Sequence, residues 1–117
     1  MTERRKFLRF ETALKALCEI VQNKSRLSSH VKNISKEGAL LVTEKPIFQG
    51  SELNLSIDVP GDNVPIFASC EVAWQKEQGG DHLYETGVRF THINNLDRGR
   101  LLEHIYTQWL RFLDKTQ

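Results

Sequence analysis

The sequence predicts an all-β domain with a C-terminal helix, built as a six-stranded antiparallel β-barrel. Two observations predict this fold. Apolar and polar residues alternate in short segments separated by clusters of Gly, Pro, Asn and Asp, as in antiparallel strands joined by turns. The last segment instead repeats its apolar residues at helical spacing. A closed barrel leaves no strand edge exposed, and a helix can cover an open end or side of it with its apolar stripe.

Size and charge favour a single soluble domain. The chain has 117 residues, of which 39% are hydrophobic and 26% are charged, as is usual for one globular core. Its net charge of +1 argues against a molecule that binds polyanions over its whole surface, so any basic site has to be local. No run is long enough to span a membrane, and no apolar signal-peptide segment follows the N-terminus. We therefore expect a bacterial-type cytoplasmic domain without membrane insertion.

The first strand follows an N-terminal arm, residues 1–11. Residues 12–22 fit two patterns. Every second residue from Leu14 to Ile20 is apolar, as in a strand, but the apolar residues of 10–21 also recur at helical spacing. We favour a strand because the segments that follow are strongly β.

Five more strands are expected further along the chain. Their ranges are 26–32, 39–43, 53–59, 66–75 and 83–90. Alternation is most regular in the third of these, where each second residue from Leu53 to Val59 is apolar. The Gln-Gly-Gly-Asp segment at 78–81 is typical of a hairpin loop between the last two strands.

A helix is expected from about residue 95 to 113, where apolar residues follow helical spacing. Asn94 and Asp97 are three residues apart, the spacing of a helix cap. Tyr106 and Trp109 belong to the apolar stripe, so we expect both in the core.

The sequence shows no pattern of metal binding or catalysis. Its four histidines share no ligand spacing with each other or with the cysteines, and no nucleophile–base order, phosphate-binding glycine loop or carboxylate pair stands out. We expect no metal, no cofactor and no enzyme activity. Cys18 and Cys70 lie in apolar alternations, so we expect buried thiols rather than a disulfide.

Two short motifs carry the functional signal. The arm concentrates four cations, Arg4, Arg5, Lys6 and Arg9. Arginine offers a planar fork that matches phosphate oxygens and the O6/N7 edge of guanine. Residues 33–38, Asn-Ile-Ser-Lys-Glu-Gly, place an amide, a hydroxyl and a glycine at turn spacing. Together the motifs suit an anionic guanine nucleotide; separately, they are typical of a solvated basic tail and a structural Asx-turn.

Through these two motifs the chain resembles the PilZ domain, a bacterial receptor module for cyclic di-GMP. Arg5-Lys6-Phe7-Leu8-Arg9 is similar to the family's RxxxR motif, and Asn33–Gly38 is similar to its [D/N]xSxxG motif. The Val72-Ala73-Trp74 segment and the Gly87-Val88-Arg89-Phe90 ending are similar to its late strands. The resemblance covers nearly the whole chain. It implies a six-stranded barrel with its helix over residues 12–117 and a ligand site where the arm meets the barrel.

The resemblance gives the arm its ligand contacts. Arg5 and Arg9 would face the phosphates and the guanine O6/N7 edge. Arg4 would add a third guanidinium, or be plain surface charge.

The resemblance also gives the barrel its ligand contacts. Asn33 and Ser35 would contact guanine and phosphate or ribose oxygens, and Gly38 would let the backbone turn near the ligand or reach a positive φ. Asn33 stands where the family often has aspartate, so its hydrogen bonds to guanine lack a charge. Trp74 would either stack on a base or pack in the core with the Ile66–Trp74 face.

The leading hypothesis is therefore a single-domain cyclic di-GMP receptor that relays ligand binding to an unidentified protein effector through ordering of its arm. The alternative is a PilZ-like protein-interaction module that does not bind nucleotide. A small barrel for single-stranded nucleic acid would need a basic groove with interleaved aromatic residues. The late strands and helix carry mixed charge instead, so we expect no nucleic-acid partner.

Overall fold

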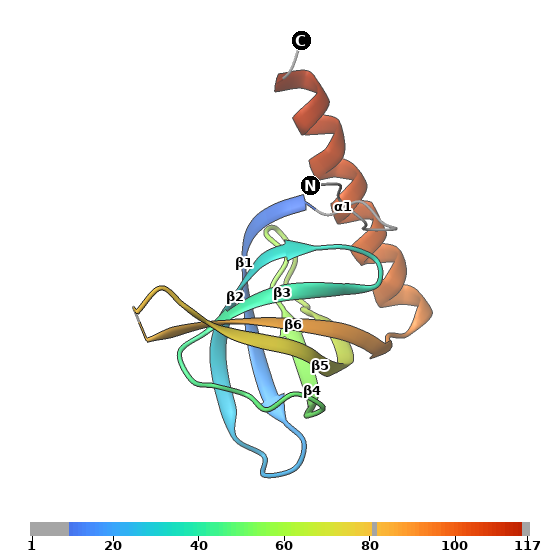
Figure 1. Ribbon diagram of the computed structural model, residues 1–117. Coiled ribbons are helices and arrows are strands. Elements are labelled where there is room, and N and C mark those ends of the chain that lie inside the picture. The colour runs from blue at the N-terminus through green and yellow to red at the C-terminus, as the bar shows by residue number, and fades with distance from the viewer. Residues whose placement is uncertain (1–9, 81, 116–117) are drawn as a thin grey trace.

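A computed structural model, which describes residues 10–80 and 82–115, shows a closed barrel of six antiparallel strands with one helix (Figure 1). The elements are β1 (Phe10–Ile20), β2 (Arg26–Ile34), β3 (Gly38–Thr43), β4 (Glu52–Ile57), β5 (Ile66–Gln78), β6 (Leu83–His92) and α1 (Asn95–Lys115). The strands follow one another around the barrel in the order β1-β2-β3-β6-β5-β4, and β4 pairs with β1. The predicted fold class is confirmed, as is the choice of a strand after the arm.

The start of β1 fixes where the arm joins the barrel. The strand begins at Phe10, so the last two residues of the predicted arm are paired in a sheet. Phe10 is paired with Ile34, and Glu11 with Asn33. Residues 1–9 lie outside the described residues. The arm thus enters the barrel directly beside the second predicted motif.

The hydrophobic core fills the barrel and is built from alternate residues of the strands. Its fully buried large side chains include Val31, Ile34, Leu41, Ile47, Leu53, Leu55, Ile57, Ile66, Val72 and Leu101. Burial of every second side chain is the period that a strand with one face on a core requires. The helix contributes Leu101, which closes one end of this core.

The two cysteines lie in the core as free thiols, which confirms the expectation of buried thiols. Cys18 Sγ lies 3.3 Å from the Ser29 hydroxyl oxygen. Burial, with the nearby Cys18 as a smaller cause, raises the pKa of Cys70 to about 12, and burial also raises the pKa of Cys18. Since the thiolate is the reactive form, both groups are poor nucleophiles at neutral pH.

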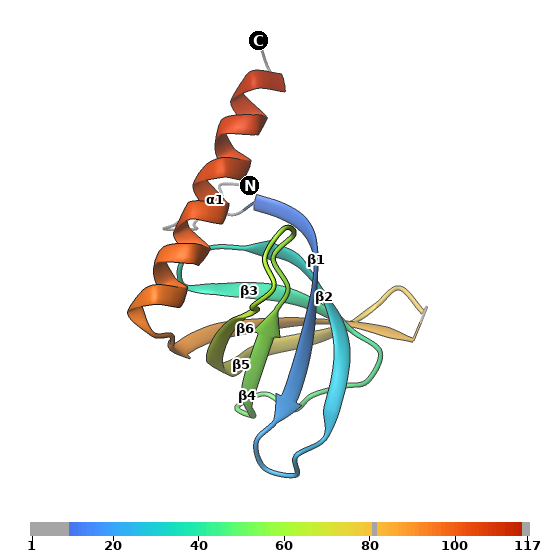
Figure 2. The same ribbon diagram turned by 180° about the vertical axis from the view of Figure 1, so that it is seen from behind.

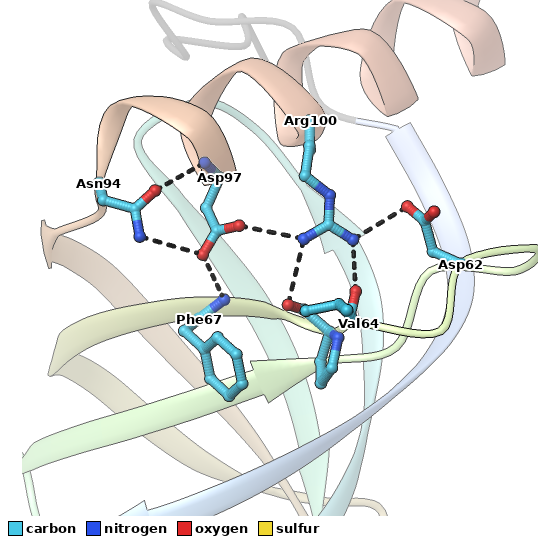
Figure 3. A network of polar contacts seen from close by, with 7 residues as sticks. Asp62, Val64, Phe67, Asn94, Asp97 and Arg100 are labelled. Atoms are coloured by element: carbon cyan, nitrogen blue, oxygen red, sulfur yellow. Dashed lines mark hydrogen bonds and ion pairs between the residues drawn. The ribbon is translucent and has the colours of Figure 1, made fainter.

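The first turn of α1 is held to the barrel by Asp97 (Figure 3). The Asp97 backbone N–H donates to Asn94 Oδ1 at 2.8 Å, which confirms the predicted cap. Asn94 Nδ2 donates to the Asp97 carboxylate at 3.3 Å, and so does the backbone N–H of Phe67 in β5 at 3.1 Å. The Asn94 side chain therefore caps the helix, and the buried Asp97 carboxylate holds Asn94 in place and fixes the first turn to β5.

Arg100 extends this network to the loop between β4 and β5 (Figure 3). Its guanidinium donates to Asp97 at 3.0 Å and to Asp62 at 2.9 Å. It also donates to the backbone oxygens of Val64 and Pro65. The planar fork thus holds the β4–β5 loop against the helix.

The C-terminal half of α1 projects past the barrel (Figures 1 and 2). Ile105 still packs on the core, but Tyr106 is 57% exposed. The expectation that Tyr106 is a core residue is wrong, because the helix is longer than the barrel end that it covers. Trp109 is half-buried beside Tyr106, with the ring centroids 6.0 Å apart, and is not part of the described core. No helix among the described residues is both long and apolar enough to cross a membrane.

Candidate functional site

One row of cross-strand neighbours connects the second predicted motif to the predicted tryptophan. Backbone pairing places Asn33 opposite Leu40, Leu40 opposite Gly87, and Gly87 opposite Trp74. Leu40 follows the buried Ala39 and precedes the buried Leu41, so the row lies on the outer face of the barrel. A pocket of about 320 Å³ is lined by these four residues together with Glu37, Ala39, Ala73, Val88 and Arg89.

Trp74 faces outward because of a β-bulge. Alternation from Ile66 to Val72 buries every second side chain of β5, and continuing it would place Trp74 in the core. The pairing between β5 and β6 shifts between Val72 and Trp74, so the strand gains one residue and the indole turns to the outer face. The side chain is 44% exposed, and the core interpretation of Trp74 is therefore wrong.

Gly87 makes room for the indole. An ideal Cβ on Gly87 would lie 2.3 Å from Nε1 and 2.4 Å from Cε2 of Trp74, which no real contact permits. The absent side chain therefore lets the ring lie directly against the backbone of β6. This leaves an aromatic surface that is flat and partly exposed, which is what base stacking requires.

The turn after Asn33 is closed by Ser35. The buried Ser35 hydroxyl accepts from the Glu37 backbone N–H at 3.3 Å and donates to the Gly38 carbonyl oxygen at 3.4 Å. The Ser35 backbone N–H donates to the same carbonyl oxygen at 2.9 Å. The turn interpretation of this motif thus holds in the form of a serine turn, and the turn positions Asn33 at the edge of the pocket.

Gly38 is required for close packing and not for a positive φ. It starts β3 opposite Arg89 of β6, and it is not among the residues with positive φ. An ideal Cβ at this position would lie 2.1 Å from the Val88 carbonyl oxygen. The expected positive φ is therefore wrong, and the reason for this glycine in the barrel is the close approach of β6, which the sequence did not indicate.

A charged pair borders the row on one side. Arg89, which lines the pocket, donates to Glu71 of β5 at 3.0 Å. Sequence reasoning did not identify Leu40, Gly87 or Arg89 as site residues. The signal for them lies in the register of β3, β5 and β6, which places them beside Asn33 and Trp74 and is not readable from the alternation of one strand.

A second charged cluster borders the row on the other side. Glu85 is buried and bonds Lys32 of β2 at 2.9 Å and Lys76 of β5 at 3.4 Å. The hydrogen bond from Lys32 is the main cause that lowers the pKa of Glu85. This cluster connects three strands next to Gly87 and Trp74.

The predicted site residues separate into two groups. Asn33 and Trp74 line one pocket on the outer face, and Ser35 and Gly38 lie in the turn that follows Asn33 directly but do not line that pocket. Arg4, Arg5 and Arg9 lie outside residues 10–80 and 82–115. Within those residues, no group of three or more His, Cys, Asp and Glu side chains is arranged to hold a metal ion.

Comparison with solved structures finds the same fold in several proteins of known structure, and three of them illustrate it. The PilZ domain of YcgR from Escherichia coli, solved with c-di-GMP, has a TM-score of 0.76 at 15% identity, over 97% of this chain and 98% of that chain. The Bacillus subtilis inhibitor of motility (MotI/DgrA) has a TM-score of 0.78 at 20% identity, over 94% of this chain and 53% of that chain. The MrkH–c-di-GMP complex of K. pneumonia has a TM-score of 0.67 at 18% identity, over 99% of this chain and 57% of that chain. The chain thus spans about half the length of the last two.

At these identities the likeness shows the fold, and the family comes from the sequence. No curated protein matches the chain. The family model described as PilZ domain matches residues 3–107, from the arm to the middle of α1. That match includes both motifs, all six strands and the row from Asn33 to Trp74. The chain belongs to the PilZ domain family.

Proposed function

We propose that this protein is a receptor for the bacterial second messenger c-di-GMP. One observation carries the proposal: the pairing of Glu11 with Asn33 brings the end of the arginine-rich arm to a row that continues through Leu40 and Gly87 to Trp74. The strand that continues the first motif therefore pairs directly with the second motif, although the two are about two dozen residues apart in sequence. Membership of the PilZ family and the c-di-GMP bound by YcgR and MrkH support the same ligand.

The barrel would supply recognition of the base. Trp74 offers a stacking surface, worth about 1–3 kcal/mol per base. The Asn33 amide can both donate to and accept from the polar edge of guanine. Ser35 and Gly38 would act by holding the turn that presents Asn33, since the Ser35 hydroxyl is already bonded within that turn.

The arm would supply the charge. A c-di-GMP molecule carries two phosphodiester groups, and arginine binds such oxygens through two parallel hydrogen bonds. Arg5 and Arg9 are the proposed phosphate and guanine contacts, with Arg4 as a third guanidinium. Arg89, held by Glu71, adds a cation on the barrel side of the same pocket.

Relay to a protein effector would follow from ordering of the arm on the ligand. Ordering changes the surface around β1 and the Asn33 turn, and a partner that prefers one arrangement shifts the population toward it. We propose this role without a catalytic step, in the cytoplasm of a bacterium.

Isothermal titration calorimetry tests the proposal with three ligands: c-di-GMP, GTP and a short single-stranded oligonucleotide. We expect saturable binding of c-di-GMP alone. Binding of none of the three would contradict a receptor and favour a protein-interaction module. Tighter binding of the oligonucleotide would instead indicate a nucleic-acid barrel.

Arginine variants locate the site in the same assay. Arg5→Ala and Arg9→Ala should each weaken c-di-GMP binding by at least about tenfold, because each removes a charged bidentate contact. Arg26→Ala is the matched control, since Arg26 lies at the far end of β2 from Asn33 and pairs with Glu19 at 3.6 Å. Equal loss of affinity in all three variants would show a general charge effect and contradict the assignment.

A further inference from the structure

The projecting part of α1 carries an apolar ridge that the barrel does not cover. Leu102, Tyr106 and Leu110 are spaced four residues apart, and they are 41%, 57% and 42% exposed. Residues at this spacing stand one above another on a helix. Trp109 packs beside Tyr106 and widens the ridge at its centre.

The ridge lies on a face of α1 that residues 10–80 and 82–92 of the barrel do not cover. Asp97, Leu101 and Ile105 face the barrel. Thr107 and Arg111 face the β4–β5 loop across a second pocket. At 100° per residue, the ridge points away from both directions. A short helical segment is marginal in water without packing partners, so a contact along this ridge would stabilise the part of α1 that projects past the described barrel.

We propose that the ridge is the contact surface for a second copy of this chain, related to the first by a two-fold axis that passes beside Tyr106. The ridge is self-complementary about that residue: with the helices antiparallel, each Tyr106 meets its counterpart and each Leu102 meets Leu110 of the second copy. Rows at four-residue spacing are also the ridges by which helices most often interdigitate. A symmetric pair satisfies both copies with one patch.

The occupant follows from the chemistry of the patch. The ridge is apolar and aromatic from Leu102 to Leu110, with the charges of Arg98 and Glu103 at its margins, so its centre selects for an equally apolar helix and not for a charged segment. Three leucine and tyrosine positions on each side make a small interface, well below the standard area of about 1,600 Å². The dimer is therefore weak and depends on protein concentration.

Sedimentation velocity of the full chain over a wide concentration range tests the proposal. The parent protein should shift from monomer toward dimer as its concentration rises. Tyr106→Glu should raise the dissociation constant by at least about tenfold, since it places two charges on the axis. Phe48→Ser is the matched control, because Phe48 is 86% exposed in the loop before β4, and this variant should dimerise like the parent. Circular dichroism checks that each variant keeps its fold.

Cysteine trapping gives an independent measurement. Both native cysteines are buried, so a thiol introduced on α1 is the accessible one. Under mild oxidation Tyr106→Cys should form disulfide-linked dimers, and Thr107→Cys, on the pocket side, should form few. A parent chain that stays monomeric at all concentrations would overturn the proposal. So would dimers that appear only after Phe7→Ser, because the arm would then be the segment that covers the ridge.

Discussion

At the scale of single residues, two glycines of the candidate site are needed because neighbouring atoms leave no room for a Cβ. Neither Gly38 nor Gly87 has a positive φ, and each has a neighbour where a Cβ would lie. The neighbour of Gly38 is a backbone carbonyl oxygen, which cannot move without the strand. The neighbour of Gly87 is the Trp74 side chain, which can rotate away. Substitution at these two positions therefore separates the stability of the barrel from the shape of the site.

Gly87→Ala should reduce c-di-GMP affinity by at least about tenfold with a small change in stability, because the indole must leave the surface on which a base would stack. Calorimetry and thermal denaturation measure the two effects. Gly99→Ala in α1 is the control, since nothing lies within 4 Å of its ideal Cβ. It should leave binding unchanged and stabilise the helix by up to about 1 kcal/mol. Unchanged affinity in Gly87→Ala would contradict the stacking role of Trp74.

Asn33→Asp should keep or strengthen c-di-GMP binding, because a charged acceptor forms stronger hydrogen bonds with the N1–H and N2–H groups of guanine. Ser35→Ala should weaken binding and also lower stability by about 1 kcal/mol, because its hydroxyl closes the turn through two hydrogen bonds. Calorimetry on both variants distinguishes the roles. A marked loss of affinity in Asn33→Asp would mean that Asn33 donates its hydrogen bond instead.

At the scale of elements, the sequence predicted where strands and helix occur and missed how they meet. Alternation located β4 and β5, and the Asn94–Asp97 spacing located the start of α1. The alternation of β5 gave no sign of the bulge before Trp74, because the bulge is defined by the pairing with β6. Its one extra residue reverses the face of the side chains that follow it. Helical spacing likewise gave an apolar stripe without showing that the barrel ends before Tyr106.

The Glu85 cluster gives the sheet an acid-sensitive contact between β2, β5 and β6. The hydrogen bond from Lys32 is the main cause that lowers the pKa of Glu85 in the folded protein. The ionised carboxylate therefore stabilises the fold fully above the pKa of an unfolded glutamate, about 4.3. This stabilisation is lost as the pH falls through the lower pKa of the folded state. Glu85→Gln should therefore destabilise the barrel at pH 7 by about 1 kcal/mol, and the difference from the parent should vanish in stronger acid. Urea unfolding at pH 7 and below pH 4 measures it. A difference that stays constant with pH would mean that packing, and not charge, is what Glu85 provides.

At the scale of the whole molecule, the barrel brings together in space what the sequence keeps apart. The end of the arm, the Asn33 turn and Trp74 come from β1, β2 and β5, and the closed strand order makes them neighbours. The motifs indicated which ligand to expect, whereas the register showed which further residues, Gly87 and Arg89 among them, line the pocket beside Asn33 and Trp74.

We expect the arm to become ordered when the ligand binds. Ordering a backbone costs about 1–2 kcal/mol per residue, and residues 1–9 offer Phe7 and Leu8 as their large apolar side chains besides the terminal Met1. Arg4, Arg5, Lys6 and Arg9 also repel one another until an anion neutralises them. Ligand phosphates would supply both the charge and the contacts, so part of the binding energy would go into ordering the segment.

Amide hydrogen exchange over residues 2–9 should therefore slow when c-di-GMP is added, while exchange in the core strands stays the same. Arg9→Ala serves as the control, because in that variant the same ligand concentration should protect the arm much less. Equal and strong protection of the arm with and without ligand would leave a rigid, preformed site. The surface read by an effector would then have to change elsewhere, and the Asn33 turn, paired with the start of β1, is the next segment to measure.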